Sequence, residues 1–254
     1  MNPLDLDRVR QFVNENIVGF HQARIDSLKH LTLDGLLRKK NPYLFKAKNI
    51  ISAGELMESL LGAYISSSEE KHFGDFLEDL AVFIAGETCG GHKSAAQGVD
   101  LEFVKEDTHY VVSIKSGPSW GNSSQIRKLE QDLQRAVIRI KQSRRAATVR
   151  PVLGICYGDT RTNFNYRFPG CWKVVGQNFW YLISENEDLY TDIIEPIGYR
   201  AKQHNETFEQ EQGKVVNRFT REFIDRFCEP TGAIDWPRLV EFNSGNYDLE
   251  GVSV

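Results

Sequence analysis

The spacing of apolar residues changes at Gly90-Gly91, and this change constrains the fold more than any other feature of the sequence. Before it, apolar residues recur at helical spacing, as in FGDFLEDLAVFIAGE at 73–87. After it, residues 99–104 (VDLEFV) and 109–115 (HYVVSIK) alternate as half-buried strands do. The four residues between these strands are few enough for an antiparallel hairpin. The mixture predicts an α/β fold and excludes a helical bundle or a β-sandwich.

Further elements are predicted on both sides of the hairpin. Helices are predicted at 3–39, 52–66, 73–87, 125–145, 177–195 and 205–228, and strands at 150–157 and 172–175. The order helix, hairpin, helix, strand predicts a mixed central sheet flanked by helices, with extra helices at both ends of the chain. We expect a single domain over 1–254, with a helical N-terminal region (1–70), a core (71–185), and C-terminal helices with a loose tail after Gly245 (186–254).

Composition excludes several classes of protein. With 254 residues and 41% hydrophobic side chains, the chain can bury a core, which excludes global disorder. The formal net charge is -4, so contact with a nucleic acid must come from a local basic patch. No apolar run approaches the roughly 20 residues that a membrane span needs, and we therefore expect no membrane partner.

The cysteines and the first residues bear on the cellular compartment. Cys89, Cys156, Cys171 and Cys228 are scattered and form no CxxC pair, which argues against structural zinc and a disulfide framework. The opening residues MNPLDLDRVR carry acids and lack the apolar segment of a secretory signal. Both observations favour a reducing, cytoplasmic setting.

Polar side chains gather on one face of the predicted hairpin. Because side chains alternate along a strand, Asp100 and Glu102 point away from the core that Leu101 enters. On the second strand, Ser113 and Lys115 share one face. The pattern brings these two side chains and the two acids together near the open end of the hairpin. A lysine that faces acids at a strand end predicts a site rather than a core.

The predicted helix at 125–145 adds another acid. Counted at about 100° per residue, Glu130 lies about 60° from the centre of the apolar stripe that contains Leu129 and Leu133, whereas Asp132 lies farther round. Glu130 is therefore expected at the edge of the sheet-facing side, within reach of the hairpin acids. Carboxylates beside a lysine suit metal-assisted phosphodiester hydrolysis, because Mg²⁺ prefers oxygen ligands and activates a water molecule.

These residues resemble a known signature. Asp100 followed by Ser113-Ile114-Lys115 resembles the PD-(D/E)XK nucleases, whose core has a helix, a mostly antiparallel hairpin, a helix and a strand in this order. The string GVDLEF…VVSIKSGPSWGNSSQ is similar to a group of type II restriction endonucleases over about residues 93–133. The segment that follows is similar in layout only. The resemblance implies a restriction-endonuclease-like core.

The chain departs from this signature at two positions. Val99 replaces the proline, which matters little, whereas Ser113 replaces the second acid, which matters more. Some restriction enzymes with SxK take the missing carboxylate from the next helix, and Glu130 is placed for that role. Glu102 is its rival as a metal ligand. Glu78, which lies where some family members bring a glutamate, is expected to be an ordinary surface residue.

The resemblance implies a type II restriction endonuclease that uses Mg²⁺ to cut double-stranded DNA at a specific sequence and leaves a 5′-phosphate. It implies that Asp100 binds the metal and that Ser113 coordinates through a water. It further implies that Lys115 positions water or phosphate and that Glu130 supplies the relocated acid. Cutting both strands of a palindrome calls for two symmetric sites, so a homodimer is expected. A cognate DNA methyltransferase is expected to accompany the enzyme.

Two segments are candidates for DNA contact. Around the hairpin and the start of the next helix, where backbone donors favour anions, the candidates are Lys93, Trp120, Asn122, Ser123, Ser124 and Gln125. In the loop at 159–170, the side chains of the kinds that read base edges are Arg161, Asn163, Asn165 and Arg167. Simple turn or packing roles are the alternative for the first group. The basic stretch at 127–150, which includes Arg144 and Arg145, is either a solvated helix face or a phosphate-facing stripe.

Other functions remain open at this stage. A repair or junction-resolving nuclease of the same fold would prefer structured DNA to any linear sequence. A non-catalytic DNA-binding protein on a decayed nuclease core is suggested by Ser113. A scaffold with chance motifs would neither bind nor cut DNA.

Overall fold

The computed structural model describes residues 1–143 and 148–246. Contacts between backbone positions divide these residues into two compact units, which we describe separately. The sheet unit comprises Met1–Phe20 and Phe73–Tyr199, and the helical unit comprises His21–His72 and the described residues from Arg200 onward. The organisation into one domain with three regions stays a prediction.

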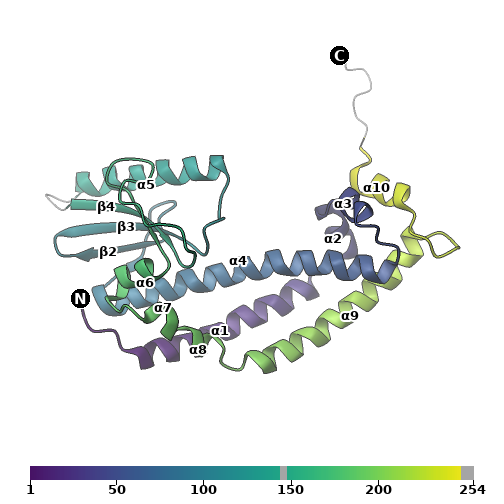
Figure 1. The fold of residues 1–254 in the computed structure, drawn as a ribbon, viewed down its shortest axis with the longest axis horizontal. Helices are drawn as coiled ribbons and strands as arrows, with labels where there is room; N and C mark the ends of the chain where they lie inside the picture. The colour runs from purple at the N-terminus through teal and green to yellow at the C-terminus, as the bar shows by residue number, and fades with distance from the viewer. Residues whose placement is uncertain (144–147, 247–254) are drawn as a thin grey trace, which may run out of the picture. The chain divides into compact units, whose positions relative to one another are not determined.

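The helices and strands are labelled in Figure 1. In chain order they are α1 (Leu6–Lys29), α2 (Leu33–Lys39), α3 (Pro42–Ala47), α4 (Ala53–Cys89), β1 (His92–Lys93), β2 (Leu101–Lys105), β3 (Thr108–Lys115), α5 (Ser123–Ser143), β4 (Thr148–Ile155), β5 (Trp172–Val175), α6 (Gln177–Ser184), α7 (Leu189–Asp192), α8 (Ile194–Ile197), α9 (Ala201–Phe227) and α10 (Trp236–Ser244).

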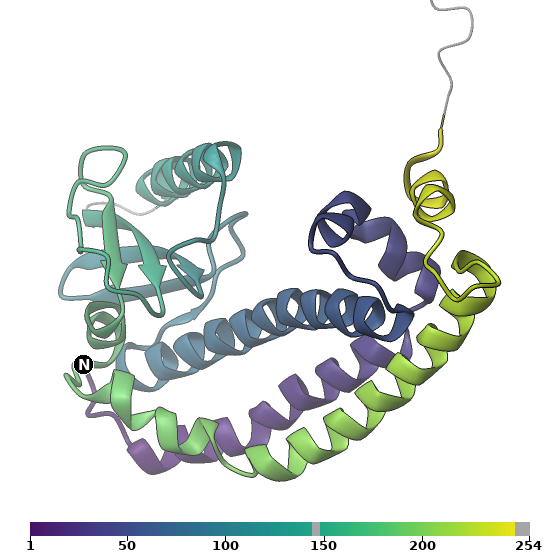
Figure 2. The ribbon, with the colours of Figure 1, turned by 45° about the vertical axis from the view of Figure 1, so that its right-hand side comes forward.

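The five strands form one mixed sheet in the order β1-β2-β3-β4-β5. β1, β2 and β3 are antiparallel neighbours, which confirms the predicted hairpin, and Leu101 pairs with Val112. β3, β4 and β5 are parallel, and α5 forms the crossover between β3 and β4. β3 and β4 run side by side in the sheet (Figures 1 and 2). Because parallel strands end at the same edge, Lys115 is paired with Ile155 there.

Helices cover both faces of the sheet. On one face, Phe103 and Ile114 pack in a cluster with residues of α4 and α6. On the other face, Val111 and Leu153 pack with Leu133 and its apolar neighbours on α5. Full burial of such a side chain is worth roughly 1.5–3 kcal/mol. The α/β prediction with a mixed sheet between helices is therefore confirmed.

The N-terminal helices differ from the prediction in two ways. The helix predicted at 3–39 ends at Lys29 and restarts at Leu33, because the Thr32 hydroxyl caps the second helix by accepting a hydrogen bond from the Gly35 N–H at 3.1 Å. The helices predicted at 52–66 and 73–87 are one continuous helix, α4. Residues 67–72 are polar, but they contain no glycine or proline, and glutamate and lysine favour helices.

The C-terminal part also differs. The helix predicted at 177–195 is divided into α6, α7 and α8, because Glu185 adopts a left-handed backbone conformation with φ of 56°. α10 was not predicted; its N-cap Asp235 accepts a hydrogen bond from the Arg238 N–H at 3.0 Å. Arg144 and Arg145 lie outside the described residues, as does the predicted loose tail from residue 247 onward.

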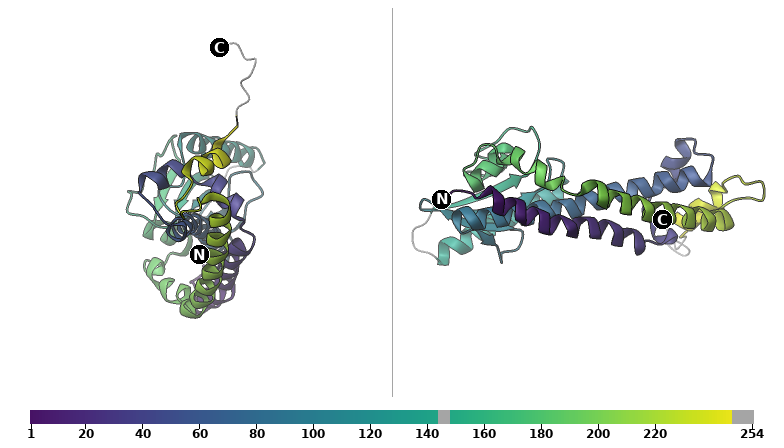
Figure 3. Two further views of the ribbon diagram at one scale, coloured as in Figure 1. Left: turned by 90° about the vertical axis from the view of Figure 1, so that its right-hand side faces the viewer. Right: turned by 90° about the horizontal axis from the view of Figure 1, so that it is seen from below.

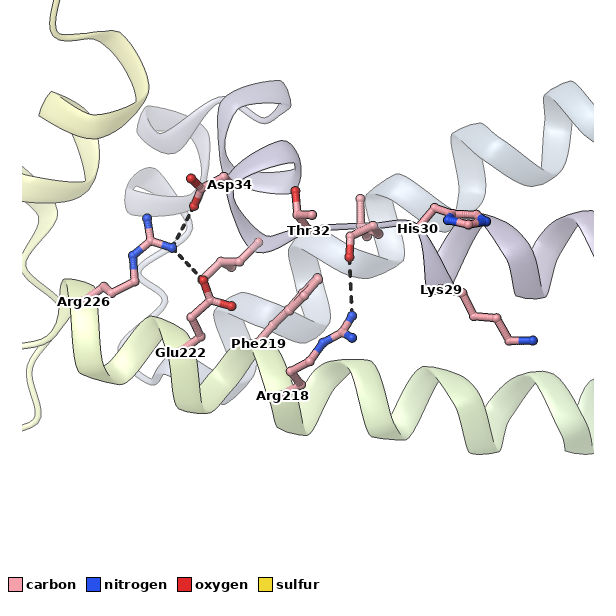
Figure 4. A pocket seen from close by; sticks show the side chains of 10 residues that line it. Lys29, His30, Thr32, Asp34, Arg218, Phe219, Glu222 and Arg226 are labelled. Atoms are coloured by element: carbon pink, nitrogen blue, oxygen red, sulfur yellow. Dashed lines mark hydrogen bonds and ion pairs between the residues drawn. The ribbon is translucent and has the colours of Figure 1, made fainter.

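The helical unit has its own core. Its segments of α1, α4 and α9 run side by side (Figure 3), and Leu28, Leu56 and Phe219 belong to one buried cluster. A pocket of about 540 Å³ opens between α2 and α9 (Figure 4), where Arg226 joins Asp34 at 2.7 Å. None of the predicted site residues lines this pocket. Across the described ranges, no helix has the length and apolar character that crossing a bilayer requires.

Candidate functional site

Asp100 stands at the open end of the hairpin, immediately before β2. Its backbone N–H donates to the Val112 carbonyl at 2.8 Å, which continues the β2–β3 ladder by one residue. Its carboxylate oxygen Oδ2 accepts hydrogen bonds from the Ile114 N–H at 2.6 Å and from the Ser113 hydroxyl at 3.2 Å. These bonds hold the carboxylate at the edge of the sheet.

Lys115 is the last residue of β3 and turns back towards this carboxylate. Its ammonium Nζ lies 3.7 Å from Asp100 Oδ2 and donates to the Ile114 carbonyl at 2.7 Å. The same Nζ lies 5.8 Å from the ring centroid of Trp120, within the range of a cation–π contact. The prediction that the hairpin brings Asp100, Ser113 and Lys115 together is confirmed by this geometry.

Glu78 on α4 is the acid that sequence reasoning placed on the surface. It pairs with Lys93 at 3.2 Å. Burial and then the negative charge of Asp100 raise the pKa of Glu78, although Lys93 and Lys115 oppose the shift. The charges of Glu78 and Asp100 therefore act on each other.

A signal in the sequence could have indicated this position. Gly74 precedes Glu78 by four residues and Ala81 follows it by three, so all three lie along one side of α4. Small residues permit close approach, and a Cβ on Gly74 would lie 3.5 Å from the Ser116 side chain. This side of α4 therefore meets the loop that follows Lys115.

The Glu102 carboxylate binds neighbours other than Asp100 and Lys115. One carboxylate oxygen accepts a hydrogen bond from the Ser94 hydroxyl, and the other lies 2.9 Å from Nε2 of the buried His109. Burial raises the pKa of Glu102, but the hydrogen bonds from Ser94 and His109 outweigh it, so that the net shift is downward. Both carboxylate oxygens of Glu102 bind these partners, and its role as a metal ligand stays a prediction.

Glu130 lies on the opposite edge of α5 from the Ser113–Lys115 side. Burial and then the charge of Glu130 raise the pKa of the Cys171 thiol to about 12, which places this acid near the loop before β5. At about 100° per residue, Glu130 and Asp132 are about 160° apart around the helix. The wheel alone does not say which edge of the helix faces the hairpin, and the role of Glu130 as the second acid stays a prediction.

Asp132 is the α5 acid that lies beside Ser113 and Lys115. It is only 4% exposed and forms an ion pair with Arg135. A cavity of about 250 Å³ is lined by Gly98, Ser113, Lys115, Trp120, Gln125, Lys128, Leu129 and Asp132. Gly98 has a φ of 73°, and a Cβ there would lie 2.5 Å from Asp132 Oδ2. The glycine therefore gives Asp132 room to approach.

The residues predicted to bind DNA at the start of α5 have local structural roles. The Asn122 side chain accepts hydrogen bonds from the backbone N–H groups of Ser124 and Gln125, both at 3.1 Å. The Gln125 side chain accepts in return from the Asn122 N–H at 2.9 Å, which completes a capping box. Ser123 begins the helix and is exposed. DNA contact by these residues stays a prediction.

The loop at 159–170 is braced by its own asparagines. Asn163 pairs with Lys173 in an antiparallel bridge beside β5, and Asn165 accepts a hydrogen bond from the Gly170 N–H at 3.2 Å. Arg161 and Arg167 are exposed. Base reading by these four residues stays a prediction.

The pair Asp100 and Glu78 fits a magnesium ion. Mg²⁺ is commonly held by one or two carboxylates, with waters and substrate phosphate completing its shell. Two carboxylates whose charges repel each other, one with a raised pKa, present negative charge that a cation relieves. Among residues 1–143 and 148–246, no group of three or more histidine, cysteine, aspartate or glutamate side chains is arranged to hold a metal.

Comparison with known families identified the family of this chain. The family model described as type II restriction endonuclease EcoO109I matches residues 7–205 of this chain. A search of curated proteins gave no match. The matched range includes Glu78, Asp100, Ser113, Lys115 and Asp132.

Proposed function

Because the chain belongs to the type II restriction endonuclease EcoO109I family, we propose that it hydrolyses double-stranded DNA at a specific sequence with Mg²⁺ and leaves a 5′-phosphate. The observation that supports this chemistry best is the contact of Lys115 with Asp100 beside a second carboxylate, Glu78. A cation and two acids at the open edge of a sheet fit phosphodiester hydrolysis.

Asp100 and Glu78 would hold the metal. A Mg²⁺ ion bound there would supply an activated water and would neutralise negative charge on the phosphate. The hydrogen bonds from Ile114 and Ser113 fix the Asp100 carboxylate in one orientation, because both are accepted by its oxygen Oδ2. We assign the role of the second acid to Glu78 instead of Glu130. Ser113 orients Asp100 by donating a hydrogen bond from its hydroxyl group.

Lys115 acts on the phosphate and the attacking water. Its ammonium group is held between the Ile114 carbonyl and Asp100, with its side chain 29% exposed. A fixed positive charge at this place stabilises the charge that develops on the phosphate oxygens. The ammonium also donates to the attacking water and keeps it in line with the scissile bond.

The expected partners follow from the reaction. Cutting both strands of a palindromic site calls for two copies of the chain related by a two-fold axis. A cognate methyltransferase would protect the host DNA. The four cysteines are free thiols, in keeping with a cytoplasmic enzyme.

Incubation with plasmid and phage DNA tests the proposed function. Discrete fragments should appear with Mg²⁺ and should be absent both with EDTA and with the Asp100→Asn variant. Mapping the fragment ends then identifies the target sequence. Intact DNA with Mg²⁺ and Mn²⁺ alike would overturn the proposal.

Ser113 favours a second candidate, a DNA-binding protein without nuclease activity, because a serine stands where the signature has an acid. This protein would retard DNA on a gel and leave it uncut under every divalent metal. The nearby Glu78 weighs against this alternative, because it provides a second carboxylate.

A further inference from the structure

A row of basic residues on α5 starts at the candidate cavity. Counted at about 100° per residue, Lys128, Arg135 and Arg139 lie within about 40° of one another around the helix. All three are exposed, and we call them the α5 stripe. Lys128 lines the same cavity as Lys115, so the stripe is continuous with the candidate site.

The remaining basic residues of α5 lie elsewhere on the helix. By the same count, Arg127 lies about 80–120° from the members of the stripe, towards the side opposite the sheet. Lys141 lies on the other edge, close in angle to Glu130, which is near the loop before β5. Of the five basic residues on α5, the three of the stripe therefore follow the edge that meets the cavity, whereas Arg127 and Lys141 do not.

The stripe keeps most of its positive charge. Within the described ranges, no ion pair is formed by Lys128 or Arg139. Arg135 is paired with the buried Asp132, although 64% of the arginine side chain is exposed. A guanidinium group has five N–H donors, so the ion pair orients Arg135 and leaves further donors for a ligand.

The length of the stripe suits a polyanion. Lys128 and Arg139 are separated by about 16 Å along the helix at about 1.5 Å per residue. One strand of B-DNA carries a phosphate for about every 3.4 Å of helix axis, so that the stripe spans several phosphates of one strand. Because the chain as a whole has a negative net charge, this local concentration of cations does not follow from an overall excess of basic residues.

We propose that the α5 stripe binds the DNA phosphates that flank the scissile phosphate, and that it guides one strand across the edge of α5 into the cavity. This inference rests on the proposed nuclease function. Phosphate contacts position DNA and carry no base information. The stripe therefore adds affinity for any duplex, whereas the choice of sequence depends on other residues.

The test compares two double variants with the same change in charge. Lys128→Gln/Arg139→Gln removes two cations of the stripe, and Arg127→Gln/Lys141→Gln removes two cations from elsewhere on the same helix. Binding of a labelled DNA duplex is measured in EDTA over a range of KCl concentrations, and heat unfolding shows that each variant is folded. Each phosphate contact contributes roughly 0.9 to the slope of log K against log salt. The stripe variant should lose about two such contacts, and the control variant should keep the wild-type slope.

Two results would overturn the inference. Equal losses in both variants would mean that only net charge matters, and a wild-type slope in the stripe variant would mean that DNA does not follow this edge. Plasmid cleavage by the wild-type protein separates this test from the proposed function. If the wild type cuts DNA and the stripe variant keeps its slope, only the stripe is overturned; a wild type that neither binds nor cuts overturns both.

Discussion

The open end of the β2–β3 hairpin and its middle each have a glutamate beside the strands, and the two glutamates have opposite surroundings. In the middle, Glu102 accepts hydrogen bonds from Ser94 and His109, and its pKa is lowered despite burial. At the open end, burial and the charge of Asp100 raise the pKa of Glu78, against the effect of Lys93 and Lys115.

The difference teaches how to separate a structural acid from a reactive one. A buried carboxylate whose oxygens all have donors stabilises the fold. A carboxylate that faces another carboxylate costs stability, because like charges repel and burial removes water. Groups with such perturbed pKa values gather at functional sites. On this comparison we propose a structural role for Glu102 and a role at the site for Glu78.

The largest expected effect comes from Asp100 and Lys115, which lie together at the open end of the hairpin. Asp100→Asn and Lys115→Met should each reduce DNA cleavage by at least about 10³-fold, because several kcal/mol of charge stabilisation are lost. Heat unfolding and DNA retardation should stay close to those of the wild type. Full cleavage by either variant would contradict the assignment of the open end as the reactive one.

Glu78→Gln should reduce cleavage by about 10²-fold, because one of two proposed metal ligands is replaced by a weaker one. Asp79→Asn is the matched control, since Asp79 is the next residue on α4 and lies farther from Lys93, at 3.8 Å. The control should cleave at close to the wild-type rate. Equal rates for the two variants would remove Glu78 from the site.

Glu102→Gln should act on stability rather than on cleavage. Replacing a buried carboxylate that accepts from Ser94 and His109 should lower the free energy of unfolding by about 1–2 kcal/mol, as judged by urea titration. The cleavage rate per folded molecule should change little. A large loss of rate without a loss of stability would show that Glu102 belongs to the site after all.

The two glutamates should also differ in their dependence on pH. The lowered pKa of Glu102 contributes stability above the unfolded value of 4.5, and this contribution is lost as the pH falls through the folded pKa. The raised pKa of Glu78 has the opposite sign, so its ionised form is destabilising at neutral pH. Without metal, Glu78→Gln should therefore be more stable than the wild type at pH 7, and this gain should vanish below about pH 4.5. A constant difference across this range would be inconsistent with the raised pKa.

The smallest effect is expected for Glu130→Gln. Glu130 lies on the far edge of α5, close to Cys171, and its replacement should change cleavage by less than about twofold, within the range of ordinary surface changes. Plasmid digestion beside Glu78→Gln measures both. A stronger loss for Glu130→Gln than for Glu78→Gln would reverse the assignment of the second acid.

Local patterns predicted much of the sheet. β5 occurs at 172–175 as predicted, and the hairpin register brings Asp100 beside Ser113 and Lys115 because alternation decides which side chains share a face. Local patterns did not predict Glu78, which comes from another element and approaches Asp100 only through tertiary packing. They also did not determine how α5 is rotated over the sheet. The sequence therefore predicted Glu130 as the second acid, whereas Asp132 is the α5 acid that lines the cavity.

Anomalous diffraction from crystals soaked in Mn²⁺ tests the central claim most directly, since it locates the metal. We expect a peak between the carboxylates of Asp100 and Glu78, at about 2.0–2.3 Å from an oxygen of each. Occupancy should fall in crystals of Glu78→Gln and persist in those of Glu130→Gln. A peak at Glu102 or Glu130, with none beside Asp100, would contradict the account.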